Sequence, residues 1–307
     1  MITSIFNKSK SINFIVIFFI ALLAFVVSKL NLTNEAITTG VIVKQAFLLF
    51  VIFASILLLN FIVSKNSLTK KNNFEMLLFS LFLLTITQTT NHSNILISNF
   101  FVLLGLRRVV SLRSQKDVKK KLFDASFWIA IAALFYFLAI LFFALILISL
   151  VLYLDNNLRH WIIPFIGALT VFTFGVSISV VFFNNYFELF DTPFMMSYDF
   201  SNYNSVKHLT AITLLLSFGI WSSIFYLNNI KKKKKAQRAS FKIIIFAALI
   251  GFLMVVQAPN KNGSEFLFLF APLAIIIANY IETIQEKWFK EVFFGVLIVM
   301  PFLLLVL

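Results

Sequence analysis

Cysteine is absent from this chain of 307 residues, and charged residues are scarce at 12%. Without cysteine the protein can form no disulfide, no thiolate nucleophile and no Cys-ligated zinc or iron–sulfur site. A soluble globular domain carries about a quarter charged residues. The hydrophobic content of 61% and the mean hydropathy of +0.97 therefore exclude a soluble domain and indicate an integral membrane protein.

The sequence motifs of common enzyme classes are missing as well. The chain has no P-loop and no GxGxxG, HExxH or GxSxG sequence, and it predicts neither a cofactor nor a metal site. No acidic residue or histidine falls in the middle of a predicted span, which argues against a proton- or ion-coupled relay. We find no internal repeat of the transporter type. A transporter is therefore the least favoured function.

Apolar segments separated by short polar breaks predict an all-α, polytopic bundle of about eleven transmembrane helices. Segment 122–153 is ambiguous, because it can form one long tilted helix or two short crossings at about 122–136 and 137–153. The other spans are expected at 11–30, 41–64, 74–90, 93–108, 161–185, 208–229, 241–257, 265–281 and 291–307. The whole chain, 1–307, is expected to form a single integral membrane domain.

The distribution of basic residues favours two crossings in the ambiguous segment. Two crossings leave only four of the 26 Lys and Arg residues outside: Lys29, Lys44, Lys207 and Lys261. A single crossing would place the block Lys231–Lys235 outside, against the positive-inside rule. The sequence therefore predicts a cytoplasmic N-terminus, an extracytoplasmic C-terminus, and basic cytoplasmic loops at 107–121 and 230–242.

The net charge of +14 could also indicate nucleic-acid binding. The basic residues, however, form short clusters between apolar runs, which is the pattern that orients membrane proteins. No nucleic-acid partner is expected. The 41 Phe residues, together with abundant Ile, Asn and Lys, fit an AT-rich bacterial genome. We therefore expect a multi-pass protein of the bacterial inner (cytoplasmic) membrane.

The densest basic segment carries three arginines, Arg107, Arg108 and Arg113, followed by lysines at 116 and 119–121. The simplest interpretation is orientation of the chain plus attraction to anionic membrane lipids. The alternative is that the segment docks a phosphate-bearing substrate or an acidic partner protein. The three arginines are thus candidate contacts for a lipid or a phosphate group.

Lys44 is the cation that lies deepest within a predicted span, about one turn inside the second one, near its outer end. A lysine in this position can extend its ammonium group to the outer head groups. Alternatively, it contacts the phosphate of an anionic lipid head group, with Glu35 as a neighbour. Lys44 is therefore a further candidate phosphate contact.

The extracytoplasmic loop 186–207 is rich in aromatic and acidic residues and predicts a lid or a short amphipathic helix in the outer interface. Its Asp191 and the later Glu265 are candidate catalytic residues. A carboxylate in the loop could serve as a general base, although it is more often merely solvated. His92 and His208 are expected on the same side of the membrane. A single histidine is more often structural than catalytic.

Two stretches resemble polytopic glycosyltransferases and polysaccharide polymerases that use polyprenyl-phosphate sugars. Residues 120–137, KKLFDASFWIAIAALFYF, are similar to the short-helix hairpin of those enzymes, and residues 265–280, EFLFLFAPLAIIIANY, to a late helix. The resemblance implies Glu35 as the acid, Lys44 at the lipid phosphate and a polyprenyl-phosphate-linked sugar as a partner. The first outer loop, Asn31–Gly40, is shorter than in those enzymes, and Glu265 replaces a frequent arginine.

The chain as a whole also resembles an uncharacterised family of bacterial polytopic membrane proteins that carry a domain of unknown function. The favoured function is a non-catalytic subunit or scaffold in cell-envelope biogenesis, which binds other membrane proteins through its basic loops and apolar surface. The alternatives are a divergent glycosyltransferase-like enzyme that acts at the outer face, and a transporter. Membrane lipids are expected partners in each case.

Overall fold

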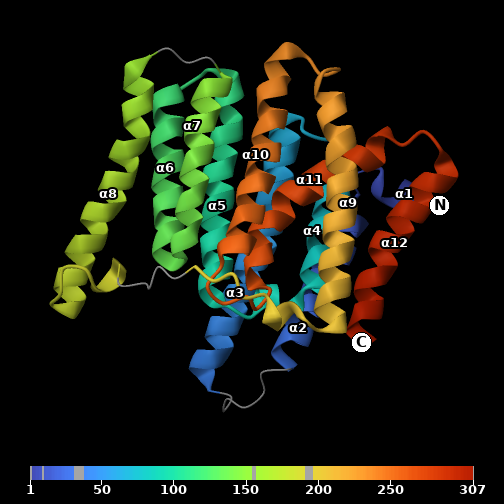
Figure 1. Cartoon of the computed structure of the whole chain (residues 1–307), viewed down its shortest axis with the longest axis horizontal. Helices are drawn as coiled ribbons and strands as arrows, with labels where there is room; N and C mark the ends of the chain where they lie inside the picture. Colours follow the sequence, from blue (N-terminus) through green and yellow to red (C-terminus); the bar gives the residue numbers. More distant parts are fainter. Residues whose placement is uncertain (1, 9, 31–37, 154–156, 191–195, 307) are drawn as a thin grey trace.

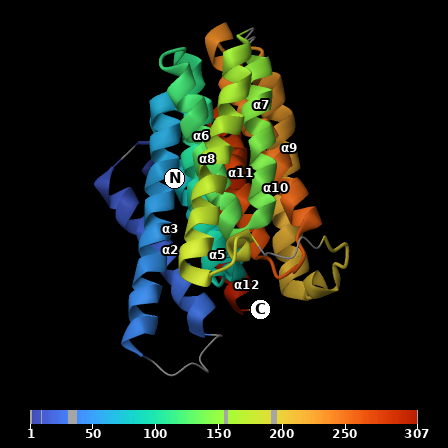
Figure 2. The ribbon, with the colours of Figure 1, turned by 90° about the vertical axis from the view of Figure 1, so that its left-hand side faces the viewer.

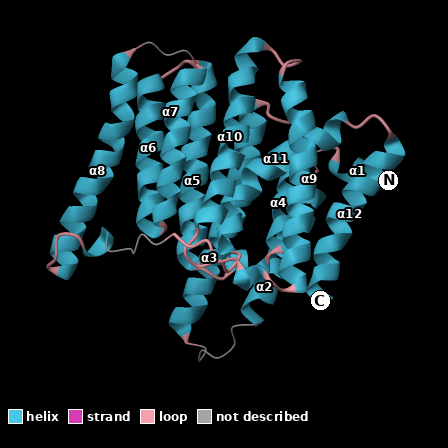
Figure 3. Cartoon of the chain, viewed as in Figure 1, coloured by secondary structure: helices cyan, strands magenta, loops and turns pink. Residues whose placement is uncertain are grey.

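The computed structural model describes residues 2–8, 10–30, 38–153, 157–190 and 196–306. Within these ranges the chain forms helices joined by turns and loops, and it contains no strand (Figure 3). The α-helices are α1 (Ile2–Phe6), α2 (Ser11–Leu30), α3 (Thr39–Asn66), α4 (Phe74–Thr85), α5 (Ser93–Ser111), α6 (Val118–Phe135), α7 (Phe143–Leu152), α8 (Leu158–Phe183), α9 (Val206–Ile230), α10 (Lys235–Gln257), α11 (Leu267–Thr283) and α12 (Lys287–Val306). The predicted all-α fold is confirmed.

Each of the eleven predicted spans corresponds to one helix, from α2 to α12. In the described part of the chain, eight helices are long and apolar enough to cross a membrane, and α4 and the segment Phe137–Leu152 are shorter apolar helices. The chain is therefore a multi-pass membrane protein. The ambiguous segment forms two helices, α6 and α7, because the backbone becomes extended at Tyr136 (φ −147°, ψ 104°).

Consecutive helices run in alternating directions between two ends of the bundle (Figure 1). The end that carries the turns at 67–73, 112–117 and 231–234, the upper end in Figure 1, is here named the lysine-rich end. The turns at 86–92 and 258–263 lie at the opposite end. Figure 2 shows that α2 and α3 extend beyond the other helices at this opposite end. The 28 residues of α3 span about 42 Å, more than the roughly 30 Å hydrocarbon core of a bilayer.

Two helices form the centre of the bundle. All twelve side chains of α4 are buried, and α11 is buried over nearly its whole length. They pack against each other through aromatic contacts, in which the Phe270 ring meets Phe82 at 5.6 Å and Phe79 at 6.4 Å between centroids. A helix that is apolar on every side is stable only when protein or lipid surrounds it, and here protein does so.

At the edge of the bundle, α8 packs mainly against α6 (Figure 1). Gly167 makes this close approach possible, because a Cβ atom at this position would lie 2.8 Å from the Phe123 carbonyl oxygen and would collide with the Ser126 side chain. Small residues commonly permit such backbone contacts between membrane helices. The remaining surface of α8 is apolar and exposed.

The polar connections differ from the predicted loops in length. The basic segments predicted as loops at 107–121 and 230–242 are short turns, 112–117 and 231–234, and most of their basic residues lie in the flanking helices. Lys and Arg are good helix formers, so the helices continue past the apolar segments. In the described part of 186–207, the chain forms two 3-10 turns, η4 (Glu188–Phe190) and η5 (Ser201–Tyr203), rather than an amphipathic helix.

Candidate anion-binding site

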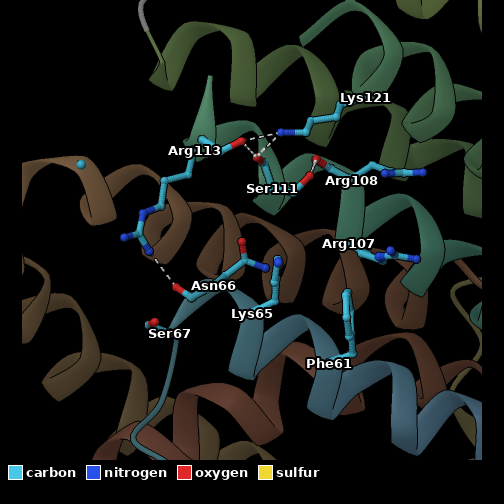
Figure 4. Close-up of a pocket in the computed structure, with 11 residues that line it drawn as sticks. Phe61, Lys65, Asn66, Ser67, Arg107, Arg108, Ser111, Arg113 and Lys121 are labelled. Carbon is cyan, nitrogen blue, oxygen red and sulfur yellow. Dashed lines mark hydrogen bonds between the residues drawn. The ribbon is translucent and has the colours of Figure 1, made fainter. Parts of the chain in front are cut away.

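A pocket of about 590 Å³ opens at the lysine-rich end, where the last turns of α3 and α5 meet the first turns of α6 and α10 (Figure 4). Five cationic side chains line it, together with three serines, and none of the described lining residues is acidic. The lining consists of Phe61, Lys65, Asn66, Ser67, Arg107, Arg108, Ser111, Arg113, Ser114, Lys121 and Ala236. The pocket therefore has the charge and the hydrogen-bond donors of an anion-binding site.

Several of these cations are held in place by neutral groups. The Arg113 guanidinium donates a hydrogen bond of 2.8 Å to the Asn66 carbonyl oxygen, which joins the end of α3 to the turn after α5 (Figure 4). The Lys121 ammonium donates to the carbonyl oxygen of Ser111 at 2.9 Å and to Ser114 Oγ at 2.6 Å. These bonds position the two cations without neutralising their charge.

Arg107 is positioned by an aromatic ring, since its guanidinium carbon lies 4.5 Å from the centroid of the Phe61 ring. Such a cation–π contact orients the planar guanidinium and leaves its N–H groups free to bind a ligand. Arg108 differs, because it forms an ion pair of 2.8 Å with Asp124 of α6. Both partners of this pair are partly exposed, so it contributes little to stability.

The local sequence explains how the pocket forms. Phe61 and Lys65 are four residues apart and share one face of α3, while Ser67 ends that helix in a left-handed conformation with φ 53°. Arg107 and Arg108 lie at the C-terminal end of α5, where the helix dipole favours cations. The turn from α5 to α6 then brings Lys121 back beside the end of α5.

The arrangement is suited to binding rather than to chemistry. Arginine and lysine side chains that converge from several helices can bind a phosphate group through many charge-assisted hydrogen bonds. The lining serines have no histidine or carboxylate among the described lining residues to act as a general base. The described lining of the pocket thus combines many hydrogen-bond donors with no general base beside its serines.

The structure brings together three of the predicted phosphate contacts, because Arg107, Arg108 and Arg113 all line this pocket. The fourth, Lys44, is exposed near the start of α3. It precedes Lys65 by 21 residues on the same helix, a distance of about 32 Å at 1.5 Å per residue. Lys44 is therefore at the opposite end of the bundle, away from the pocket.

The predicted catalytic residue Glu265 is fully buried at that opposite end. Its carboxylate accepts hydrogen bonds from the Tyr203 hydroxyl and, at 3.2 Å, from the Gly263 backbone N–H. The other two predicted catalytic residues, Glu35 and Asp191, lie outside the described residues. Their catalytic roles stay predictions.

Next to Glu265, a buried lysine holds the loop before α9 against the bundle. The Lys261 ammonium donates hydrogen bonds to the carbonyl oxygens of Val255, Val256 and Ala258 at 3.2, 2.6 and 3.1 Å, and so caps the C-terminal end of α10. It also lies 4.6 Å from the centroid of the Phe200 ring in that loop. Burial lowers the pKa of Lys261 from its usual value.

The two histidines that the sequence predicts on this side occupy separate settings. The His92 ring contacts Asn262 Nδ2 through Nε2 at 2.8 Å, and burial together with the charge of Lys29 lowers the pKa of His92. His208 contacts Ser205 Oγ through Nδ1 at 2.7 Å, at the start of α9. The His208 contact is local, whereas the His92 contact joins the turn before α5 to the turn after α10.

The sequence interpretation missed part of the pocket. It included Lys121 in the basic segment that could dock a phosphate-bearing substrate, but it proposed neither Lys65 nor Phe61 as a contact. The four-residue spacing of Phe61 and Lys65, an aromatic residue before a cation at a helix end, is a signal that could have identified them. Nothing in the sequence shows that these two residues face Arg113, because that contact depends on how α3 and α5 pack.

The sequence model of a family of unknown function, DUF6427, matches residues 1–306, which is essentially the whole chain. The chain belongs to this family. Comparison with curated proteins and with solved structures finds no match. The resemblance to an uncharacterised family is thereby confirmed, while the resemblance to glycosyltransferases stays a prediction.

Proposed function

We propose that this member of a family of unknown function is a non-catalytic membrane protein that binds a phosphate group in the pocket at its lysine-rich end. The phosphate belongs either to a lipid head group or to a soluble phosphate ester. The observation that carries the proposal is that five cationic side chains line one pocket, with no acid among its described lining residues.

The position of the pocket supports a ligand at the membrane surface. Its residues lie in the terminal turns of helices that are apolar over most of their length, so the pocket opens near the depth of lipid phosphates. By the positive-inside rule, the lysine-rich end faces the cytoplasm, which places the N-terminus inside and the C-terminus outside. In a bacterium this topology corresponds to the inner membrane.

A non-catalytic role follows from what the pocket contains. Its arginines and lysines are fixed by carbonyl oxygens and by an aromatic ring, so they form a rigid binding surface. In this proposal, the protein acts as a subunit or scaffold in cell-envelope biogenesis, and an anionic ligand occupies its cytoplasmic face. Binding of the ligand would join the ends of α3, α5 and α6.

Binding of defined phosphates to the full chain tests the proposal. The detergent-solubilised protein is titrated with inorganic phosphate and with methyl phosphate by calorimetry, and nanodiscs of phosphatidylglycerol or phosphatidylcholine are compared by native mass spectrometry for retained lipid. We expect the wild type to bind either a soluble phosphate in the titration or the phosphate-bearing lipid phosphatidylglycerol in the nanodiscs. Substitution Arg107→Gln or Lys121→Gln should weaken this binding about tenfold, the effect of losing one charge-assisted hydrogen bond.

The chain offers a matched control for the charge change. Lys119→Gln removes the same charge from the same turn of α6, but Lys119 is exposed and does not line the pocket. It should leave binding within about twofold of the wild type. An equal loss in Lys119→Gln and Lys121→Gln would show that the turn acts only through its general charge, and the proposed pocket would be wrong.

A second candidate function is favoured by the buried carboxylate at the opposite end. Glu265 is buried and accepts a hydrogen bond from Tyr203, and the positive-inside rule puts this end outside, where an enzyme that uses a lipid-linked sugar would carry its acidic residues. Transfer from a polyprenyl-phosphate-linked sugar, measured for the wild type and for Glu265→Gln, tests it. Equal transfer by the two proteins would eliminate Glu265 as a catalytic residue.

A further inference from the structure

A second pocket, of about 310 Å³, adjoins the last turns of α3 at the same end of the molecule. Ser67 lines both pockets and so marks where they meet (Figure 4). The two pockets lie against different faces of α3: Phe61 and Lys65 line the first pocket, and Asn60 and Ser64 line the second. The second pocket is completed by Val63, Thr69, Lys70, Lys71, Asn72 and Glu75.

The lining of the second pocket is unlike that of the first. Hydroxyl, amide and carboxyl groups predominate, and the two lysines, Lys70 and Lys71, are exposed. In contrast to these two lysines, Glu75 is buried, with only 1% of its surface exposed. It belongs to the first turn of α4, where the helix dipole favours an acid.

Glu75 is incompletely bonded. Its Oε2 atom is buried and has no hydrogen-bond partner among the described residues. The neighbouring acid, Glu282, differs in that its Oε1 accepts hydrogen bonds from the Lys70 backbone N–H at 2.8 Å and from the Asn72 amide. Buried polar atoms are nearly always bonded, so an open acceptor in the wall of a pocket points to a ligand that supplies the donor.

The chemistry of that ligand follows from its surroundings. An ammonium group would meet repulsion from Lys70 and Lys71, whereas a neutral hydroxyl can donate to Glu75 and accept from these lysines. Serine, threonine and asparagine side chains at the same pocket provide further partners for hydroxyls. The lining therefore fits a polyhydroxylated group.

We propose that the two pockets form one site for a phosphate ester that carries free hydroxyl groups, with its phosphate among the arginines and its hydroxyls at Glu75. The proposal rests on the proposed function, since it requires the phosphate to bind in the first pocket. It defines the ligand as a polyol phosphate, such as a glycerol phosphate, on a lipid or in solution.

Three soluble probes with the same phosphate chemistry test the proposal on the detergent-solubilised full chain. Calorimetry compares methyl phosphate, which has no hydroxyl, with glycerol 3-phosphate and with phosphoethanolamine. We expect glycerol 3-phosphate to bind about tenfold more tightly than methyl phosphate, the effect of one hydrogen bond to a carboxylate. Phosphoethanolamine should bind no more tightly than methyl phosphate.

Two variants separate the second pocket from the first. Glu75→Leu should remove the preference for glycerol 3-phosphate and leave the dissociation constant of methyl phosphate unchanged. Ser64→Ala, at an exposed position that tolerates substitution, should reduce the preference about threefold, as expected for a weaker neutral hydrogen bond. Ser177→Ala, an equally exposed helical serine on α8, serves as the control and should change nothing.

The possible results distinguish the two proposals. If methyl phosphate and glycerol 3-phosphate bind equally well, the hydroxyl subsite is refuted and phosphate binding stands. Tighter binding of phosphoethanolamine would replace the hydroxyl subsite with a cation subsite. If no phosphate binds, in solution or as retained lipid, both proposals fail. Retention of phosphatidylglycerol over phosphatidic acid in nanodiscs would identify a lipid as the source, and a preference only in solution would identify a soluble ester.

Discussion

Replacement of Lys261 by methionine should destabilise the end of the molecule opposite the lysine-rich end. The ammonium of Lys261 donates three hydrogen bonds, of 2.6 to 3.2 Å, to carbonyl oxygens at the end of α10. Only 1% of its surface is exposed, so water cannot readily replace these bonds. Methionine keeps the length and the apolar character of the side chain and removes only the donor.

The expected magnitude follows from the three carbonyl oxygens that lose their donor. Leaving a buried acceptor unsatisfied costs about 1 kcal/mol or more, so the loss should be on the order of 3 kcal/mol in the free energy of unfolding. With an unfolding entropy of about 2.1 cal/mol/K per residue over 307 residues, this corresponds to a decrease of about 5 °C in Tm. Thermal unfolding in detergent measures it.

A second measurement tests the contact between Lys261 and the loop before α9. Because the ammonium also lies over the Phe200 ring, its loss should increase proteolytic cleavage of the segment 196–205 under native conditions. Lys207→Met is the control, since it removes the same charge from the same end of the molecule. Equal Tm values and equal cleavage rates for the two variants would refute the capping role of Lys261.

Three further predictions concern packing and pH. Gly167→Leu should prevent α8 from packing against α6 and lower Tm by several degrees, whereas Gly295→Leu, where a side chain meets open space, should be tolerated. Tyr203→Phe removes the hydroxyl that bonds the buried carboxylate of the α10–α11 turn, and should cost about 1 to 3 kcal/mol in unfolding free energy, against no measurable change for the exposed Tyr198→Phe. Because the pKa of His92 is below the usual 6.5 in the folded state, the unfolded state binds more protons as the pH falls through 6.5, and stability should decrease there. A pH series of Tm values checks this, and a His92→Gln variant that loses stability equally on acidification would contradict it.

Residues that lie close together in the sequence were easier to group than residues that only the fold brings together. Arg107, Arg108 and Arg113 line one pocket, because basic residues that are close together at the end of one helix stay close in the fold, while their role as phosphate contacts stays a prediction. Lys44 was predicted at the outer end of its span, on the side opposite the arginines, and the length of α3 does place it at the end of the bundle away from them. The sequence does not mark Glu75 as a site residue, since an acid in the first turn of an apolar helix is common.

The loop before α9 illustrates the same limit. Its aromatic and acidic composition suggested a lid or an amphipathic helix, but Tyr203 inserts into the bundle to meet Glu265, and Phe200 lies over Lys261. These contacts join residues about 60 positions apart in the chain. The composition of the loop predicts a surface segment. The residues that it contacts, Lys261 and Glu265, lie in and beside the turn between α10 and α11 and cannot be identified from the loop sequence.

The sequence by itself determined the eleven apolar helices from α2 to α12, their approximate ends and the concentration of basic residues at one end of the bundle, but not the short α1. These properties depend on local hydropathy and charge, because each segment enters the bilayer according to its own apolar length and its flanking basic residues. Only the tertiary structure decided that Lys65 and Phe61 of α3 share a pocket with Arg113 and Lys121, and that the Glu75 carboxyl lines a second one beside it. The reason is that a pocket arises where helix ends meet, and the lateral packing of helices depends on close contacts such as that at Gly167, which no single segment encodes.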